Sequence, residues 1–156
     1  MKMLKEVEAY WTRRAESYSD VVCHELNHSN EKSWMEVILK EIPEDKKIKI
    51  ADMGTGPGFF AISLAKRGYD VTAVDYTQEM LNHAMQNAGT YASRITWMRG
   101  DVQNLENIQD GSFDVIVTRN LTWNLEEPQK AYQEWCRVLK KGGILLILMQ
   151  DGITIF

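Results

Sequence analysis

Residues 47–75, with the sequence KIKIADMGTGPGFFAISLAKRGYDVTAVD, decide the fold of this chain. Ile48, Ile50 and Met53 predict a buried strand that ends near Asp52. A glycine turn, a helix and a second strand follow in that order. This order predicts a right-handed βαβ unit, which binds a nucleotide-like ligand where the strand order of a sheet reverses.

The glycine turn is the run Gly54-Thr55-Gly56-Pro57-Gly58. No ordinary helix or strand tolerates this density of glycine and proline, so the run predicts a tight turn. Apolar residues at helical spacing come next, and Gly68 stands where a helix commonly ends. The second strand closes on Asp75. The turn therefore joins the first strand to a helix beside the end of the second strand.

The spacing of the glycines narrows the range of candidate ligands. A dinucleotide fingerprint needs a small residue at the position of Phe59, whereas here the third glycine comes one residue earlier, at Gly58. The pattern Asp52-x-Gly54-x-Gly56-x-Gly58 instead resembles motif I of the class I S-adenosylmethionine (SAM)-dependent methyltransferases. A structural turn in another α/β protein is the alternative interpretation.

The resemblance implies SAM as cofactor, with S-adenosylhomocysteine (SAH) as product. Glycines let a ligand lie against bare backbone, and the helix N-terminus offers free N–H groups to a carboxylate. Asp75 is then expected to accept hydrogen bonds from both ribose hydroxyls, and Asp52 to face the ammonium or hold the loop. The expected cofactor residues of this segment are Asp52, Gly54, Thr55, Gly56, Gly58 and Asp75.

Two further strings resemble segments of the same family. RGDVQNL (99–105) resembles the segment that meets the adenine, which implies roles for Asp101 and the Val102 backbone, unless Asp101 only caps a turn. Tyr76, which follows the acid of the second strand, would lie against the adenine face. YWTRRAESYSD (10–20) resembles an N-terminal helix that closes over the cofactor, with Tyr10 and Tyr18 as contacts, although the helix could merely pack.

The methyl acceptor is expected beside the loop after the apolar strand FDVIVT (113–118). Asn120 stands where nitrogen methylators place Asn or Asp, and Trp123 could face the sulfonium or belong to the core. The string RNLTW replaces the NPPY-type string of the family, which argues against amino-group methylation of nucleic acid or protein. Asn120 and Trp123 are catalytic candidates, Asn120 is also an expected cofactor contact, and no catalytic base is predicted.

The whole chain alternates apolar strands with amphipathic helices. This pattern predicts an α/β, three-layer sandwich: a doubly wound, Rossmann-like parallel sheet of order 3-2-1-4-5 with helices on both faces. Residues 3–19 and a second segment ending at Pro43 are expected to be helical, as is a segment from Pro128 that Gly142-Gly143 terminate. Residues 144–149 form the expected fifth strand.

The chain ends shortly after that strand, so the fold is expected to be truncated, without the two further strands of the family. The open edge of the fifth strand should then be covered by another copy, in a possible homodimer, or by residues 151–156. The length of 156 residues favours one SAM-binding domain, with N-terminal helices or lid in 1–44 and the Rossmann-like core in 45–156.

Charge and sequence pattern argue against nucleic acid, a membrane and a metal ion as partners of this chain. The net charge is −4, which argues against nucleic acid because phosphate binding needs a basic surface. The N-terminus lacks the apolar core of a signal peptide, and the longest apolar run is far too short to cross a membrane. Cys23, Cys136, His24 and His28 have no metal-ligand spacing, so no metal is expected. A small-molecule partner and a cytoplasmic location follow as expectations.

Three classes of function remain. The first is a SAM-dependent methyltransferase with a small-molecule acceptor. The second is a catalytically inactive SAM- or SAH-binding fragment or regulatory subunit. The third is an NAD-dependent oxidoreductase, which Phe59 disfavours.

Overall fold

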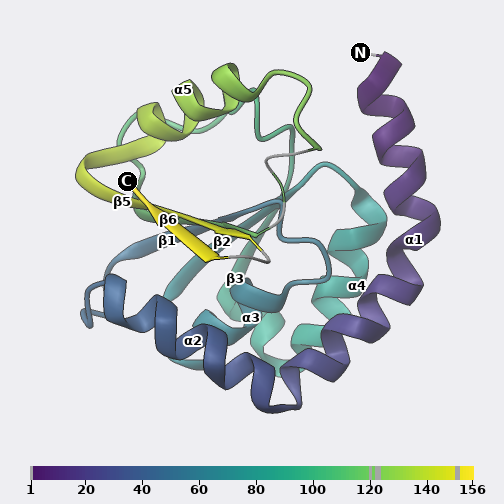
Figure 1. Ribbon diagram of the computed structural model, residues 1–156, viewed down its shortest axis with the longest axis horizontal. Helices are drawn as coiled ribbons and strands as arrows, with labels where there is room; N and C mark the ends of the chain where they lie inside the picture. Colours follow the sequence, from purple (N-terminus) through teal and green to yellow (C-terminus); the bar gives the residue numbers. More distant parts are fainter. Residues whose placement is uncertain (1, 120, 122–123, 150–151) are drawn as a thin grey trace.

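One sheet with helices on both faces makes up the fold, as the computed structural model shows for residues 2–119, 121, 124–149 and 152–156 (Figure 1). The strands are β1 (Lys49–Met53), β2 (Asp70–Asp75), β3 (Ile95–Arg99), β4 (Phe113–Arg119), β5 (Leu139–Met149) and β6 (Gly152–Ile155). The helices are α1 (Lys2–Leu26), α2 (Ser29–Glu41), α3 (Phe59–Lys66), α4 (Gln78–Ala88) and α5 (Pro128–Val138), with a 3-10 turn η1 (Gly89–Arg94).

The strand order is β3-β2-β1-β4-β5-β6, and neighbouring strands from β3 to β5 are parallel. This confirms the predicted order of the first five strands. The order reverses between β1 and β4, whose carboxyl ends therefore border the crevice in which sheets of this kind bind ligands.

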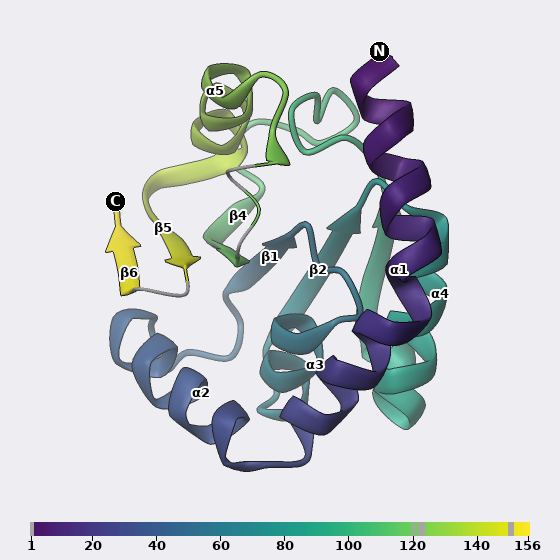
Figure 2. The same cartoon turned by 45° about the vertical axis from the view of Figure 1, so that its right-hand side comes forward.

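Two apolar clusters hold the layers together. α2, α3 and α4 cover one face of the sheet and α5 covers the other (Figure 2). Ile38 of α2 and Leu64 of α3 are fully buried on the first face, and Trp135 of α5 is fully buried on the second. Each such side chain contributes about 1.5–3 kcal/mol on burial, so both layers hold the strand ends in a fixed arrangement.

The first helix is longer than predicted. The sequence indicated a helix over residues 3–19, whereas α1 continues to Leu26. Val22 carries the apolar stripe one turn further, and its side chain is 1% exposed. The added turn brings the end of α1 to the point where α2 begins, and α1 also lies alongside α4 (Figure 2).

The boundary between α5 and β5 differs from the prediction. Gly142 and Gly143 were expected to end the helix, but α5 ends at Val138 and β5 begins at once. A Cβ on Gly143 would lie 2.9 Å from the Lys140 carbonyl oxygen and 3.0 Å from that of Asp114. Glycine is therefore needed for a close backbone approach in an irregular strand pair, rather than for a helix end.

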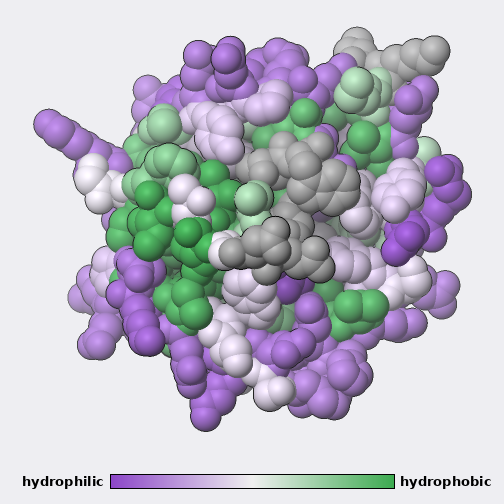
Figure 3. Space-filling model, viewed as in Figure 1, coloured by the Kyte–Doolittle hydropathy of each residue, from purple (hydrophilic) through white to green (hydrophobic). Residues whose placement is uncertain are grey.

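The sheet also extends one strand further than predicted. β6 pairs antiparallel with β5, and the backbones of Leu145 and Phe156 exchange two hydrogen bonds of 3.0 Å. The outer edge of β5 is thus covered by the chain's own tail, one of the two predicted alternatives. Hydrophobic residues gather on the surface over β5 and β6 (Figure 3), and a homodimer through this side stays a prediction.

Candidate functional site

The glycine turn links β1 to α3 and is fixed to the neighbouring strand. The backbone N–H groups of Gly54 and Thr55 both donate to the Val74 carbonyl, at 2.8 and 2.9 Å. Gly54, Gly56 and Gly58 have φ values of 70°, 54° and 94°, which side-chain-bearing residues rarely adopt. The turn therefore presents bare backbone at the carboxyl edge of the sheet.

Asp52 holds the turn from beneath. Its Oδ2 accepts from the Thr55 hydroxyl at 2.7 Å and from the Ala61 backbone N–H at 3.1 Å. The second bond serves as a cap for α3, whose N-cap residue Gly58 has no side chain to offer. Burial raises the pKa of Asp52 to about 6, although these two hydrogen bonds and the charge of Arg119 oppose the rise. The predicted loop-holding role of Asp52 is observed, and a contact with an ammonium stays a prediction.

Asp75 ends β2 directly beside the turn. Its Oδ2 accepts from the Gly56 N–H and its Oδ1 from the Thr77 N–H, each at 2.9 Å. Burial raises the pKa of this carboxyl, and the two backbone hydrogen bonds oppose the rise. Each carboxylate oxygen has a second lone pair, so Asp75 can accept further hydrogen bonds from a ligand.

Asp101 follows β3 and caps its own turn. Its Oδ1 accepts from the backbone N–H and the side-chain amide of Gln103, at 2.9 and 3.1 Å. The capping role considered from the sequence is thus present. Val102 is fixed at the same place, because its carbonyl accepts from the indole N–H of Trp135 at 3.1 Å. Contacts of Asp101 and Val102 with an adenine stay a prediction.

A cavity of about 440 Å³ brings these strand ends together beneath α1. This volume is within the usual range for small-molecule sites. The described residues that line it are Leu4, Val7, Trp11, Tyr18, Gly54, Gly56, Asp75, Tyr76, Thr77, Met80, Asp101, Val102, Gln103, Arg119, Leu121, Asn124 and Leu125. Seven of the predicted cofactor residues are in this set. The bare glycine backbone and the acid at the end of β2 fit a ligand with a ribose and an amino-acid tail.

Four of the predicted cofactor residues that the structure describes do not line the main cavity, namely Asp52, Thr55, Gly58 and Tyr10. Asp52 and Thr55 line a smaller cavity of about 20 Å³, roughly one water in size, next to the main one. Gly58 lines neither cavity, and its lack of a side chain instead lets α3 approach α4 at Ala84. Asn120 and Trp123, the catalytic candidates, lie outside the described residues.

Tyr10 is on the wrong side of α1 to reach the cavity. Leu4, Val7 and Trp11 recur at the spacing of one helix face and point into the cavity, whereas Tyr10 is 44% exposed and packs edge-on against Trp11. Tyr18, on the inner face, lines both cavities. α1 therefore forms one wall of the site, and movement of α1 as a lid stays a prediction.

Polar contacts fix α1 at that wall. The Asn87 amide of α4 donates to the Pro57 carbonyl of the glycine turn and to the Ser19 hydroxyl of α1, each at 3.0 Å. Glu8 pairs with Arg99 at 2.7 Å near the other end of the helix. The helix is thus tied to the end of β3, to α4 and to the turn itself.

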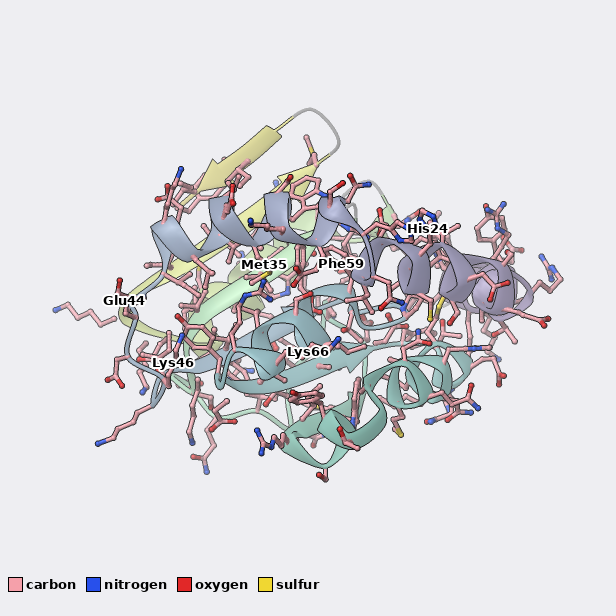
Figure 4. All side chains as sticks on the ribbon, turned by 90° about the horizontal axis from the view of Figure 1, so that it is seen from below. His24, Met35, Glu44, Lys46, Phe59 and Lys66 are labelled. Carbon is pink, nitrogen blue, oxygen red and sulfur yellow. The ribbon has the colours of Figure 1, made fainter. Side chains whose placement is uncertain are left out.

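Arg119 is a site residue that the sequence did not single out. It is the last residue of β4, and its Nη2 pairs with Glu25 of α1 at 3.0 Å. Its guanidinium lies 4.5 Å from the ring centre of Phe59, which lies between α2 and the start of α3 when the molecule is seen from below (Figure 4). The only advance signal was its position at the end of a strand beside the switch point. Trp11, also missed, could have been found from the apolar stripe of α1.

Two classes of feature are absent from the described part of the chain. Among residues 2–119, 121, 124–149 and 152–156, no group of three or more His, Cys, Asp or Glu side chains could hold a metal ion. Within these same ranges no helix has the length and apolar character to cross a membrane. The features of the site that can bind a ligand are the backbone of the glycine turn, the aspartates, Arg119 and the apolar wall from α1.

Comparison with known proteins identifies the same region. A family model described as a methyltransferase domain matches residues 51–147. The ubiquinone/menaquinone biosynthesis C-methyltransferase UbiE of Geotalea daltonii is 30% identical over 79% of the chain and 54% of its own length. The ubiquinone biosynthesis O-methyltransferase of Rickettsia typhi is 24% identical over 94% of the chain and 58% of its own length.

A solved structure agrees with this match. Phosphoethanolamine N-methyltransferase 2 of Haemonchus contortus, in complex with phosphomonomethylethanolamine and SAH, superposes with a TM-score of 0.64 at 28% identity. The superposition covers 71% of this chain and 26% of that one. The chain spans less than two thirds of the length of each of these three proteins.

Proposed function

Because the chain belongs to the class I SAM-dependent methyltransferase family, we propose that it transfers a methyl group from SAM to a small-molecule acceptor. One observation carries the proposal. A single cavity collects the glycine turn after β1, the acid that ends β2 and the acid that follows β3. These are the three places where the family's motifs put the cofactor.

Different residues bind different parts of the cofactor in this proposal. The bare backbone of Gly54 and Gly56 receives its amino-acid end, and Asp75 accepts from the ribose hydroxyls through its remaining lone pairs. Tyr76 and Val102 lie on either side of the adenine, and Asp101 accepts from its exocyclic amine. In this proposal the seven predicted cofactor residues that line the cavity keep their roles, and Trp11 takes the place of Tyr10.

The chain's contribution to catalysis is mainly positioning. SAM supplies a methyl group already activated by a positively charged sulfur, so a nucleophilic acceptor atom needs only an in-line approach. The apolar wall of Leu4, Val7 and Trp11 excludes water from the cofactor. No His, Cys, Lys or Glu is among the described residues that line the cavity. We therefore assign no general base, and the acceptor arrives deprotonated or loses its proton to the loop after β4 or to water.

A small acceptor fits the enclosed site better than a macromolecule. The cavity lies under α1, and the protein's net charge is −4, so neither a wide groove nor a basic surface supports a nucleic-acid substrate. The relatives named above include C-, O- and N-methyltransferases. The acceptor atom is thus set by residues near the mouth of the site rather than by the fold.

A binding protein without turnover is the second candidate. The observation that favours it is that both carboxylates in the cavity already accept backbone hydrogen bonds and hold local structure. Such groups suit ligand recognition more than proton transfer.

Titration followed by turnover distinguishes these functions. We expect SAM and SAH to bind in calorimetry and NAD not to bind, because the buried carboxylate of Asp52 beneath the turn disfavours a pyrophosphate. Methyl transfer from labelled SAM to any member of a panel of small phenols, amines and activated carbon acids would establish the enzyme. Binding without transfer would favour the second candidate, and binding of NAD in place of SAM would contradict both.

A further inference from the structure

Arg119 connects the two cavities of the site. Three residues line both the 440 Å³ cavity and the 20 Å³ cavity, namely Tyr18, Gly54 and Arg119. Gly54 begins the turn that faces the amino-acid end of the cofactor in the proposed function. The smaller cavity therefore continues the larger one at the end where that tail would lie.

Groups of opposite charge line the smaller cavity. Asp52, which the Thr55 hydroxyl contacts at 2.7 Å, and Arg119 are both among its lining residues, and the charge of Arg119 acts on Asp52. A free α-amino acid group carries one positive and one negative charge at neutral pH. A zwitterionic tail that lies in the larger cavity next to these residues would meet groups of both charges, whereas a neutral or doubly anionic tail would meet one unfavourable side chain.

The side chain of Arg119 is held in a partly desolvated place. It is 12% exposed, and its guanidinium lies within 6 Å of the ring centres of Phe59, Phe60 and Trp34. Cation–π contacts with these rings fix the guanidinium plane and reduce its hydration. A carboxylate that reaches it meets a preorganised charge in a region of low polarity.

Arg119 also has donors to spare. An arginine carries five N–H donors, and the structure shows one side-chain hydrogen bond for this guanidinium among the described residues, from Nη2 to Glu25. The remaining donors allow a second carboxylate to bind in the forked geometry that arginine favours.

We propose that Arg119 binds the carboxylate of the cofactor's amino-acid end, while Glu25 holds the arginine from the side of α1. This inference rests on the proposed function, because it concerns the same cofactor. It adds a specificity residue: Arg119 makes the site select a ligand with a free carboxylate. Through Glu25, cofactor binding would also strengthen the position of α1.

The competing explanation is that Arg119 only ties β4 to α1 through its ion pair. Two variants separate the explanations, because Arg119→Gln and Glu25→Gln break the same ion pair from opposite sides. Calorimetry would measure the affinity of each variant for SAH and for decarboxylated SAH, which differs only by the missing carboxylate. Circular dichroism melting would check that each variant is folded.

We expect Arg119→Gln to weaken SAH binding roughly ten- to a hundredfold, as for the loss of a hydrogen bond to a charged group. Its affinity for decarboxylated SAH should be unchanged. Glu25→Gln should weaken SAH binding much less than Arg119→Gln does, because the guanidinium and its aromatic contacts remain. The inference is overturned if Arg119→Gln weakens both ligands equally, if Glu25→Gln weakens SAH as much as Arg119→Gln, or if Arg119→Gln has no effect.

Two further measurements keep the inference testable if Arg119→Gln does not fold. The wild type should prefer SAH over its decarboxylated form, and Arg119→Lys, which keeps the charge but loses the fork, should show a smaller preference. Equal affinity of the wild type for both ligands would overturn the role of Arg119 while leaving the proposed function intact. Binding of neither ligand would overturn the proposed function itself.

Discussion

At the scale of single residues, Asp52 shows how the site is held in place at some expense of stability. Its carboxylate is 2% exposed, and burial raises its pKa to about 6. It nevertheless holds the glycine turn through Thr55 and caps α3 through the N–H of Ala61. A charge is thus retained in the interior because the turn needs its hydrogen bonds.

This raised pKa makes stability depend on pH. The folded-state pKa of Asp52 lies above the ordinary value near 4, so the folded protein binds this proton more tightly than the unfolded chain does. The free energy of unfolding should therefore decrease as pH rises from about 4 to about 6. Asp52→Asn removes this titration. The pH-dependent part of the free energy of unfolding that disappears with it is about 3 kcal/mol.

Urea unfolding of the wild type and of Asp52→Asn at about pH 4 and about pH 7 tests this prediction. Asp75, whose pKa is also raised, is present in both proteins, so the comparison removes the part of its effect that does not depend on the charge of Asp52. The wild type should lose more stability than the variant between the two pH values. Equal losses would show that Asp52 titrates normally in the folded protein.

The same scale shows where sequence reasoning succeeded and failed. Asp75 could be placed because it ends a strand one turn away from a glycine motif, which is local information. Arg119 was missed because its partners Glu25 and Phe59 are far from it in sequence and meet only in the fold. Tyr10 was assigned to the cavity because its neighbour's motif suggested a contact, although the helix spacing favours Trp11.

At the scale of elements, the close packing of α3 on α4 depends on one glycine. Gly58 has φ +94°, and a Cβ there would lie 3.0 Å from Ile62 Cδ1 and 3.1 Å from Ala84 Cβ. Gly68 has a similar φ of +89° at the other end of α3, with nothing within 4 Å of a built Cβ. Both positions have a left-handed backbone conformation, but only Gly68 has room for a methyl side chain.

Alanine at these two positions should therefore have unequal effects. Both variants incur the left-handed backbone penalty of about 1–2 kcal/mol. Gly58→Ala adds overpacking between α3 and α4, which commonly costs about 1–3 kcal/mol more. Denaturant unfolding should show Gly58→Ala as the less stable variant, and an equal loss in both would mean that α3 and α4 separate easily.

Element types could be predicted from the sequence, whereas element ends were harder. The apolar run of β4 and the glycine turn define their elements locally. The start of β5 was misplaced because a Gly-Gly pair that follows two lysines resembles a helix end, and only the neighbouring strand reveals the close approach at Gly143. Coverage of the β5 edge by the tail was one of two predicted alternatives, and the sequence did not decide between them because the four residues of β6 acquire strand structure by pairing with β5.

At the scale of the whole molecule, the site lies between one long helix and the carboxyl edge of a sheet. α1 contacts the sheet edge at Glu8, the turn and α4 through Asn87, and β4 through Glu25. The cavity is thus closed by an element from the N-terminal part of the chain over motifs from its centre. The resemblance of residues 10–20 predicted a helix that either closes over the cofactor or merely packs. The structure shows which side chains of α1 face the cavity, and closure over a cofactor stays a prediction.

The β5–β6 edge carries three of the exposed large hydrophobic residues of the described chain. Met149, Ile155 and Phe156 are 45%, 48% and 69% exposed at the β5–β6 edge, where Figure 3 shows hydrophobic residues together. An apolar edge strand is prone to pair with another chain. A homodimer formed there would leave the cavity beneath α1 open to substrate, since the two regions are formed by different elements.

The central claim is that the cavity beneath α1 binds SAM, and Asp75 tests it most directly. Asp75→Ala removes the acceptors for two ribose hydroxyls, and Asp75→Asn converts one acceptor into a donor. Asp45 offers a matched control, because its Oδ1 accepts from the N–H two residues ahead at 2.9 Å, as Asp75 Oδ1 does, but at an exposed turn away from the cavity. Asp45→Ala thus removes the same kind of side-chain to backbone hydrogen bond, at a position that contacts no ligand.

Calorimetric titration of SAH into the wild type and these three variants, with circular dichroism as the folding control, is the decisive measurement. A hydrogen bond to a charged acceptor contributes about 1.5–3 kcal/mol, so Asp75→Ala should bind SAH roughly ten- to a hundredfold more weakly or worse. Asp75→Asn should retain part of the binding, and Asp45→Ala should bind like the wild type. Unchanged affinity in folded Asp75→Ala would contradict the claim that this cavity is the SAM site.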